Sequence, residues 1–202
     1  MVLAEATMCR VSTQVLIKFE QGHKQLAFVQ HSVLRPRTVQ GLYLSKEFLY
    51  SPPCGPDVAA SSPRLGLIKS YWFKTFSHAT FTDVWNLLYG KGKKKTLSSG
   101  IITKYITALG LASIIMCDGS LSSSNQMILH MQSYTKKENE MMSKELNAKF
   151  GLRAPIVYDW VCHVISHKQK YWVINIPARD AARLRELIQL HMLPSFAYKI
   201  PR

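Results

Sequence analysis

The chain has 202 residues, of which 47% are apolar, so it is long enough for one large domain or two small ones, each with a core. No apolar run approaches the roughly 20 residues that a membrane-crossing helix needs, so we expect no membrane partner. The formal net charge of +14, spread over a globular composition, predicts a polyanionic partner, with nucleic acid favoured over acidic lipid or protein.

The cysteines and histidines form no metal-binding pattern. His163 and His167 stand four residues apart, but their neighbours predict a strand or hairpin, which favours surface or phosphate-facing histidines over metal ligands. The N-terminal stretch has neither the pattern of a secretory signal nor the basic residues of a good transit peptide. The cysteines show no CxxC spacing, which is typical of a reducing compartment; they are Cys9, Cys54, Cys117 and Cys162.

In chain order, hydrophobic periodicity predicts a similar succession of elements in each half. The first half is expected to form strands over residues 14–19 and 67–75 and helices over 22–33 and 78–89. The second half is expected to form strands over residues 126–131, 154–160 and 171–176 and helices over 136–150 and 178–192.

Two strands in these halves carry nearly the same aromatic sequence, YWF from Tyr71 and YWV from Tyr171. Chance similarity is the alternative to a repeat, but the shared order of elements favours two pseudo-symmetric units of an α+β fold. We place them at residues 1–95 and 96–202, with an inserted loop over about 51–63. A pseudo-twofold molecule suits duplex nucleic acid, whose backbone has local twofold symmetry.

The segment 102–120 combines apolar and small residues almost without interruption and predicts one buried helix. Ala108, Gly110 and Ala112 would let another backbone approach closely. Asp118 would stand at the C-terminal end of this helix, where the helix dipole disfavours a carboxylate. An acidic residue in that position indicates a bound cation or another functional role.

The run LAxxxMCDGS, which ends at Ser120, resembles the second signature helix of LAGLIDADG homing endonucleases of the monomeric, two-repeat, mitochondrial-intron type. The resemblance covers nearly the whole chain. It implies an αββαββα-like order in each repeat, with a curved antiparallel sheet and helices on one face. Four other runs match in order: KTFSHATF at 74–81, LLYGKGKKKT at 87–96, MQSYTKKE at 131–138 and LPSFAYKIP at 193–201.

The resemblance also implies a cleavage centre. In the family, the acidic residue that ends each signature helix binds divalent metal, so Asp118 and Glu5, which lies in the run LAEAT, are the implied ligands of Mg²⁺. Lys95 and Lys199 match the basic residues that support catalysis in each half. These four residues are the catalytic candidates if the chain is active.

Three departures from the family pattern favour loss of activity. Only Met1 to Ala4 precede Glu5, which would leave the first signature helix truncated, and Cys117 replaces an aspartate. The five asparagines are few for an intron reading frame in an AT-rich organelle genome, which favours a nuclear gene. We therefore predict that the chain is not an enzyme.

The preferred reading is a domesticated protein of the mitochondrial matrix that binds structured RNA, either as a ribosomal component among neighbouring proteins or as an intron-splicing cofactor. The alternative is an active, Mg²⁺-dependent LAGLIDADG endonuclease that cuts double-stranded DNA; a role in protein interaction alone is a third reading. Tyr71, Trp72 and Tyr171 could stack on unpaired bases, although a core position is favoured. The predicted nucleic-acid contacts are Lys18, Lys74, His78, Lys91, Lys93, Lys94, Lys95, Lys168, Lys170 and Lys199.

Overall fold

The computed structural model describes residues 6–11, 13–22, 49–51, 70–75, 77–90, 92, 94–161 and 169–202. The chain divides into two compact units, residues 2–86 and residues 87–202 together with Met1. The repeat boundary after residue 95 stays a prediction. In the described part of the chain, no helix combines the length and the apolar character needed to cross a membrane.

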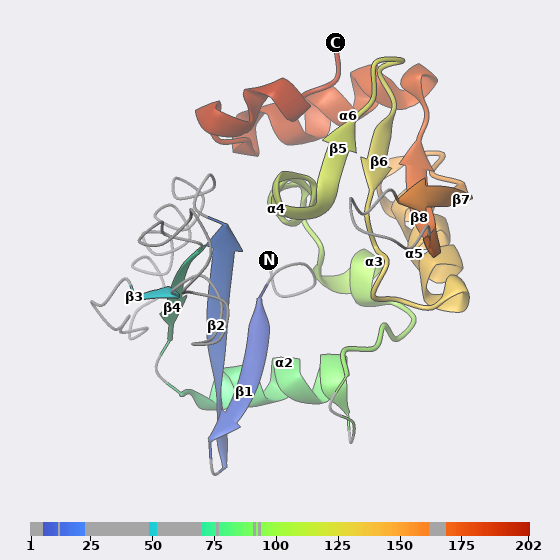
Figure 1. The fold of residues 1–202 in the computed structure, drawn as a ribbon. Coiled ribbons are helices and arrows are strands. Elements are labelled where there is room, and N and C mark those ends of the chain that lie inside the picture. The colour runs from blue at the N-terminus through green and yellow to red at the C-terminus, as the bar shows by residue number, and fades with distance from the viewer. Residues whose placement is uncertain are drawn as a thin grey trace. The chain divides into compact units, whose positions relative to one another are not determined.

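The first unit contains a four-stranded antiparallel sheet in the order β1-β2-β4-β3 (Figure 1). Its strands are β1 (Thr7–Val11), β2 (Gln14–Gly22), β3 (Leu49–Ser51) and β4 (Ser70–Lys74). Every second side chain of β2 is buried, at Val15, Ile17 and Phe19, as a sheet with one covered face requires. The predicted strand over 14–19 is confirmed. Of the helix predicted over 22–33, Gly22 instead ends β2, and the other residues lie outside the described ones.

Helix α2 (Ala79–Tyr89) follows β4 and crosses the boundary between the units. His78 stands immediately before it, and its ring Nδ1 accepts a hydrogen bond of 3.2 Å from the backbone N–H of Thr80. This bond satisfies one of the N–H groups that a helix leaves unpaired in its first turn. The predicted helix over 78–89 is therefore confirmed, with His78 as its cap.

The second unit contains a sheet with the order β5-β6-β8-β7, so corresponding strands occupy corresponding places in the two sheets (Figure 1). This shared topology is the α+β repeat that the sequence predicts. The strands are β5 (Gly119–Leu121), β6 (Met127–Leu129), β7 (Ile156–Val161) and β8 (Gln169–Ile176). All neighbouring strands pair antiparallel.

Helices cover one face of this second sheet. Helix α5 (Lys136–Phe150) packs against β7 and β8, and α4 (Ala108–Asp118) packs against α6 (Ala181–Ile188) and against β5 and β6. Burial of each large apolar side chain in such a core contributes roughly 1.5–3 kcal/mol. The fully buried members include Leu111, Ile115, Met127, Leu129, Leu146, Ile174 and Ile176.

Helix α5 has the predicted bounds because its ends are encoded locally. Thr135 and Glu138 form a capping box at its start, and Gly151 ends it in the left-handed conformation. The predicted helix over 178–192 is regular only in α6, between 3₁₀ turns at Ala178–Asp180 and Gln189–His191. A further 3₁₀ helix, Pro194–Lys199, follows it.

The single buried helix predicted over 102–120 is wrong, because the structure has two helices there. Helix α3 (Ile101–Tyr105) ends where Ile106 takes an extended conformation, and α4 starts after Thr107. The hydroxyl of Thr107 accepts a hydrogen bond of 3.2 Å from the N–H of Gly110, so this residue acts as an N-cap. Because apolar residues continue on both sides of Thr107, the hydrophobic pattern of the sequence does not reveal that one helix ends and another begins there.

Glu145 of α5 holds the start of α3. Its carboxylate accepts hydrogen bonds from the backbone N–H groups of Gly100 (2.5 Å), Ile102 (2.8 Å) and Thr103 (3.2 Å). Lys149, one turn further along α5, donates to the carbonyls of Ile102 (3.2 Å) and Thr103 (2.6 Å). The helix is too short to be stable alone, so these contacts with α5 hold it in place.

Replacing Glu145 with glutamine is therefore expected to lower the free energy of unfolding by about 1–3 kcal/mol, because an amide cannot accept all three bonds. Urea unfolding followed by circular dichroism measures the change. Glu140→Gln is the matched control, since Glu140 makes only an exposed ion pair of 3.7 Å with Lys136 and should change stability by less than about 0.5 kcal/mol. Equal effects of the two variants would contradict the anchoring role.

Candidate functional site

Asp118 ends helix α4, as the sequence predicts, and strand β5 begins at the next residue. The passage from helix to strand needs no loop because Gly119 has no side chain. A Cβ there would lie 2.6 Å from the carbonyl oxygen of Ile115, closer than real Cβ atoms approach. The junction therefore places the half-buried Asp118 carboxylate at the tip of a buried helix, next to the edge of the sheet.

Lys199 lies at the same end of α4. Its side chain is buried, with 7% of the residue exposed, and its Nζ donates to the carbonyls of Ile115 (3.2 Å) and Met116 (2.7 Å). The ammonium also lies 5.4 Å from the centre of the Phe196 ring. A cation there satisfies terminal carbonyls and offsets both the negative end of the helix dipole and the charge of Asp118.

The sequence analysis did not predict this capping role of Lys199. A signal was available, since the last carbonyls of a buried helix need donors. Sequence alone, however, does not show which distant lysine supplies them. A direct contact of Lys199 with nucleic acid stays a prediction.

Two other residues missed by the sequence analysis lie beside this end of α4. The backbone N–H of His130 donates to the backbone carbonyl of Asp118 (2.9 Å), and the His130 ring Nε2 lies 2.7 Å from the hydroxyl of Ser120. Burial raises the pKa of the Tyr134 phenol far above its ordinary value, and the negative charges of Asp118 and Glu138 raise it further. Tyr134 is therefore neutral at physiological pH.

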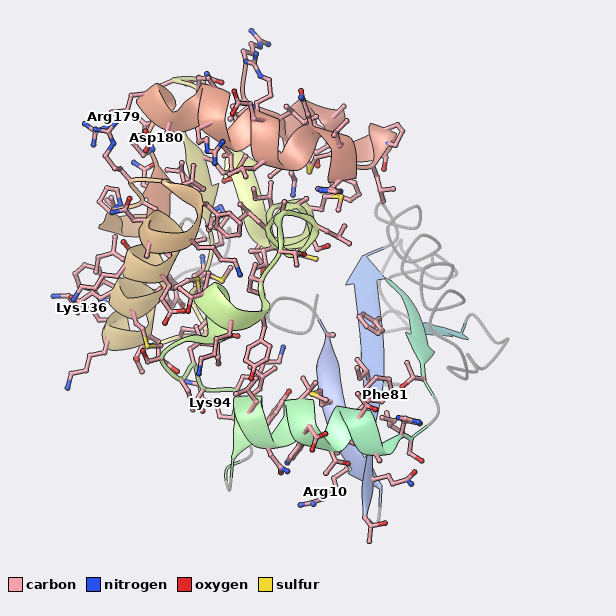
Figure 2. All side chains as sticks on the ribbon, turned by 180° about the vertical axis from the view of Figure 1, so that it is seen from behind. Arg10, Phe81, Lys94, Lys136, Arg179 and Asp180 are labelled. Carbon is pink, nitrogen blue, oxygen red and sulfur yellow. The ribbon has the colours of Figure 1, made fainter. Side chains whose placement is uncertain are left out.

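The linker that carries the lysine run is fixed to α5 through Glu138. This carboxylate accepts hydrogen bonds from the backbone N–H of Leu97 (2.8 Å) and from the N–H and hydroxyl of Thr135 (2.7 Å each). Burial alone would raise the pKa of the Glu138 carboxyl, but these hydrogen bonds, with the charge of Lys94, hold it below its ordinary value. Lys94 is exposed beside this anchor (Figure 2), and Lys95 is half-buried.

The lowered pKa of Glu138 predicts a loss of stability in acid. The carboxylate stabilises the fold above its unfolded-state pKa, near 4.5, and this contribution disappears as pH falls through the lower folded-state value. Between about pH 5 and 3, Glu138→Gln should therefore lose less unfolding free energy than the wild type. Urea unfolding at stepped pH checks this, and parallel pH profiles of the two proteins would contradict it.

The face of the second sheet opposite its helices carries polar groups. Because side chains alternate along a strand, and because Met127, Leu129, Ile174 and Ile176 are buried in the core, the residues between them point the other way. The amide of Asn175 donates to Oε1 of Gln126 (3.0 Å) on this face. Its described members are Ser120, Gln126, Ile128, His130, Val157, Tyr171 and Asn175, together with Val173, which is itself buried.

The described side chains of this face include no lysine or arginine. Described cations of the second unit lie instead on helices and in the linker, among them Lys94, Lys136 and Arg179 (Figure 2). Strands β5 and β6 contain no charged residue, and the charged residues of β7 and β8, Asp159 and Lys170, have side chains outside the described part of the structure.

The remaining predicted contacts have varied positions. Lys18 lies on the half-buried face of β2, where its Nζ is 2.7 Å from the Glu20 carboxylate, which offsets part of its charge. His78 is exposed and caps α2. Four further candidate residues lie outside the described part of the chain: Glu5, Lys91, Lys93 and Lys168. For four more, the backbone is described but the side chain is not: Tyr71, Trp72, Lys74 and Lys170.

Asp118 is the described residue that fits a divalent cation best. The described residues contain no group of three or more His, Cys, Asp or Glu side chains that could hold a metal ion. Mg²⁺ does not require such a group, since it is commonly held by one or two carboxylates together with substrate phosphates and water. A half-buried carboxylate at an open helix end meets this requirement.

Two antiparallel sheets of the same strand order, a buried helix that ends in a carboxylate and a strongly basic composition define a two-sheet α+β protein. The model of the LAGLIDADG DNA endonuclease family matches residues 1–184, and the chain belongs to this family. The family resemblance drawn from LAxxxMCDGS is thereby confirmed; the matched residues include the runs at 74–81, 87–96 and 131–138, and the run at 193–201 lies beyond them.

Two curated relatives are intron-encoded proteins by name. A probable intron-encoded DNA endonuclease 3 of Mycosarcoma maydis is 41% identical over 141 residues, which are 68% of this chain and 97% of that protein. A probable intron-encoded endonuclease 1 of Wickerhamomyces canadensis is 27% identical over 192 residues, which are 92% of this chain and 73% of that protein.

Solved structures share the fold. The homing endonuclease I-WcaI, bound to its DNA recognition sequence, has a TM-score of 0.78 at 22% identity and covers 98% of this chain and 81% of its own. A variant of I-DmoI, in complex with nicked target DNA in the presence of manganese, has a TM-score of 0.52 at 12% identity, with 95% and 93% covered. These likenesses confirm the predicted α+β fold class.

Proposed function

We propose that this chain is a site-specific, divalent-metal-dependent DNA endonuclease, which is the alternative considered in the sequence analysis. The observation that carries the proposal is the position of Asp118, whose carboxylate ends α4 beside the polar face of the sheet, with Lys199 on the neighbouring carbonyls. The names of both curated relatives include endonuclease, which supports the same reading over RNA binding.

In this proposal, the uncharged polar face of the second sheet contacts base edges, and lysines of the linker contact phosphates. Amides such as Gln126 and Asn175 can donate to and accept from bases in the major groove. Lys94 and Lys95, which follow α2, supply cations that position the duplex without regard to sequence. Affinity for DNA should therefore fall steeply with salt.

Asp118 would hold the cation at the scissile phosphate, and Glu5 as a second ligand stays what the family resemblance implies. A divalent ion bound there supplies an activated water and stabilises the leaving oxygen. The positive charge of Lys199 offsets the repulsion between the Asp118 carboxylate and the negative end of the α4 dipole. Lys95, in the linker, is the residue proposed to support catalysis from the other half. Mg²⁺ is the proposed ion, since oxygen ligands suit it.

The names of the relatives also indicate which kind of gene encodes this chain. Both are named as intron-encoded, which favours an intron reading frame for this chain over the nuclear gene that its low asparagine content predicted. We propose a mitochondrial location on the same ground. The ribosomal and splicing roles considered in the sequence analysis receive no support from these names.

A selection experiment tests the proposal. The purified chain is used to select duplexes from a randomised DNA library, and the selected duplex is then incubated with Mg²⁺, Mn²⁺ or chelator. We expect cleavage of both strands that depends on the ion, and an affinity for this duplex at least tenfold above that for a structured RNA of equal length. Tight RNA binding without metal-dependent cleavage of DNA would restore the RNA-binding reading.

A further inference from the structure

His130 contacts the chain on both sides of Gly119, at the junction between α4 and β5. Its backbone N–H donates to the carbonyl of Asp118 (2.9 Å), and its ring Nε2 makes a hydrogen bond of 2.7 Å with the hydroxyl of Ser120. His130 is the first residue after β6, and Gly119 pairs with Leu129, the last residue of that strand. A single residue thus holds Asp118 and Ser120 from the neighbouring strand.

The junction needs such support. At the direct step from helix to strand, Gly119 has no side chain and is held through its backbone, with its N–H on the carbonyl of Ile115. The ladder between β5 and β6 ends at the pair of Gly119 with Leu129, so Asp118 lies just beyond it. A displacement near 1 Å of a group that acts in catalysis can cost roughly a hundredfold in rate.

We propose that His130 is a positioning residue that fixes the backbone from Asp118 to Ser120, and with it the place of the Asp118 carboxylate for binding of the divalent cation. The role rests on the proposed function, because it assumes that Asp118 binds this ion. It needs only the two hydrogen bonds and no change in the charge of the ring. Residues that orient metal ligands in this way commonly change metal affinity tenfold to a hundredfold when they are lost.

The alternative is that the ring contacts DNA directly, since His130 lies on the polar face of the sheet and is half-buried. The two roles predict different measurements. A positioning residue acts on the affinity for the cation and on the rate of cleavage, whereas a DNA contact acts on the affinity for the duplex.

Four variants of the full chain separate these roles: His130→Leu, His130→Gln, Ser120→Ala and the control Ser123→Ala, which alters an exposed serine in the same hairpin. The probe is the duplex selected from a randomised library. Mn²⁺ is titrated calorimetrically into each protein bound to the cleaved form of that duplex, so that no turnover takes place during the titration. Cleavage rate, duplex affinity and melting temperature are measured in parallel.

We expect His130→Leu to weaken Mn²⁺ binding at least tenfold and to slow cleavage by ten- to a hundredfold, with duplex affinity changed less than threefold. His130→Gln, which keeps a polar group near the position of Nε2, should recover much of both, and Ser120→Ala should show a smaller loss of the same kind. Ser123→Ala should match the wild type. If His130→Leu does not fold, the test is made by comparing the Mn²⁺ affinities and cleavage rates of Ser120→Ala and His130→Gln with those of the wild type.

Unchanged Mn²⁺ affinity in His130→Leu and Ser120→Ala, or a loss confined to duplex affinity, would overturn the positioning role while leaving the proposed function intact. A wild-type chain that neither binds Mn²⁺ on the duplex nor cleaves it would contradict the proposed function instead, and the positioning role with it.

Discussion

Replacing Asp118 with asparagine is expected to lower the rate of DNA cleavage by roughly 10²- to 10³-fold or more, with little change in duplex affinity. Asparagine preserves the shape of the side chain but removes the charge that holds a divalent ion. The loss should fall on the chemical step, because the surface proposed to bind DNA is formed by the open face of the sheet and by the linker.

The same variant is expected to keep its stability. A negative charge at the C-terminal end of α4 opposes the helix dipole, while Lys199 offsets that charge, so its removal should change the free energy of unfolding by less than about 1 kcal/mol. Loss of activity without loss of stability is the pattern of a residue kept for function.

Single-turnover cleavage of the selected duplex and urea unfolding measure these two effects. Asp83→Asn is the matched control, because Asp83 is an exposed carboxylate on α2 without a proposed role. It should leave both quantities unchanged. Cleavage by Asp118→Asn at the wild-type rate would remove Asp118 from the site, whatever its effect on stability.

Replacing Lys199 with methionine is expected to lower the free energy of unfolding by about 2–3 kcal/mol, because the carbonyls of Ile115 and Met116 lose charged donors in a buried place. Methionine fills a similar volume, so packing against Phe196 is largely retained. Without the cation, Asp118 also faces the helix dipole uncompensated, so cleavage should fall as well.

Lys199→Arg and Lys144→Met are the informative companions. Arginine retains the positive charge and N–H donors, but its planar guanidinium is wider than the buried ammonium that it replaces. The free energy of unfolding of Lys199→Arg is therefore expected to lie between those of the wild type and Lys199→Met. Lys144 is exposed on α5 and should tolerate methionine without loss. Urea unfolding and single-turnover cleavage give the comparison, and a Lys199→Met protein as stable as Lys144→Met would contradict the capping role.

Local signals predicted several elements well. The periodicity and the capping box of α5 lie within one segment, so the helix Lys136–Phe150 has the predicted ends. The strands over 14–19 and 171–176 followed from β-branched and aromatic runs that fit a half-buried sheet. The break before α4 was missed because apolar residues on both sides of Thr107 hide a capping residue from a periodicity argument.

The candidate site divides in the same way. The position of Asp118 at a helix end was predictable, since an acidic residue and a glycine close an apolar run. The residue that donates hydrogen bonds to the end of this helix could not be predicted from the sequence. Lys199 and Met116 are 83 residues apart in the chain and meet only because the 3₁₀ helix Pro194–Lys199 packs on α4. His130 was likewise assigned no role before the β5–β6 hairpin was known.

The sequence by itself determined the family, the two-sheet α+β fold, the excess of positive charge and the place of Asp118, since these depend on composition, periodicity and runs of neighbouring residues. The tertiary structure alone decided that Lys199 is buried against α4, that Glu145 holds α3 and that the open sheet face is uncharged in its described part. The contacts of Lys199 and Glu145 arise because backbone carbonyl and N–H groups at the ends of helices need hydrogen-bond partners, and only the folded chain brings these distant side chains to them.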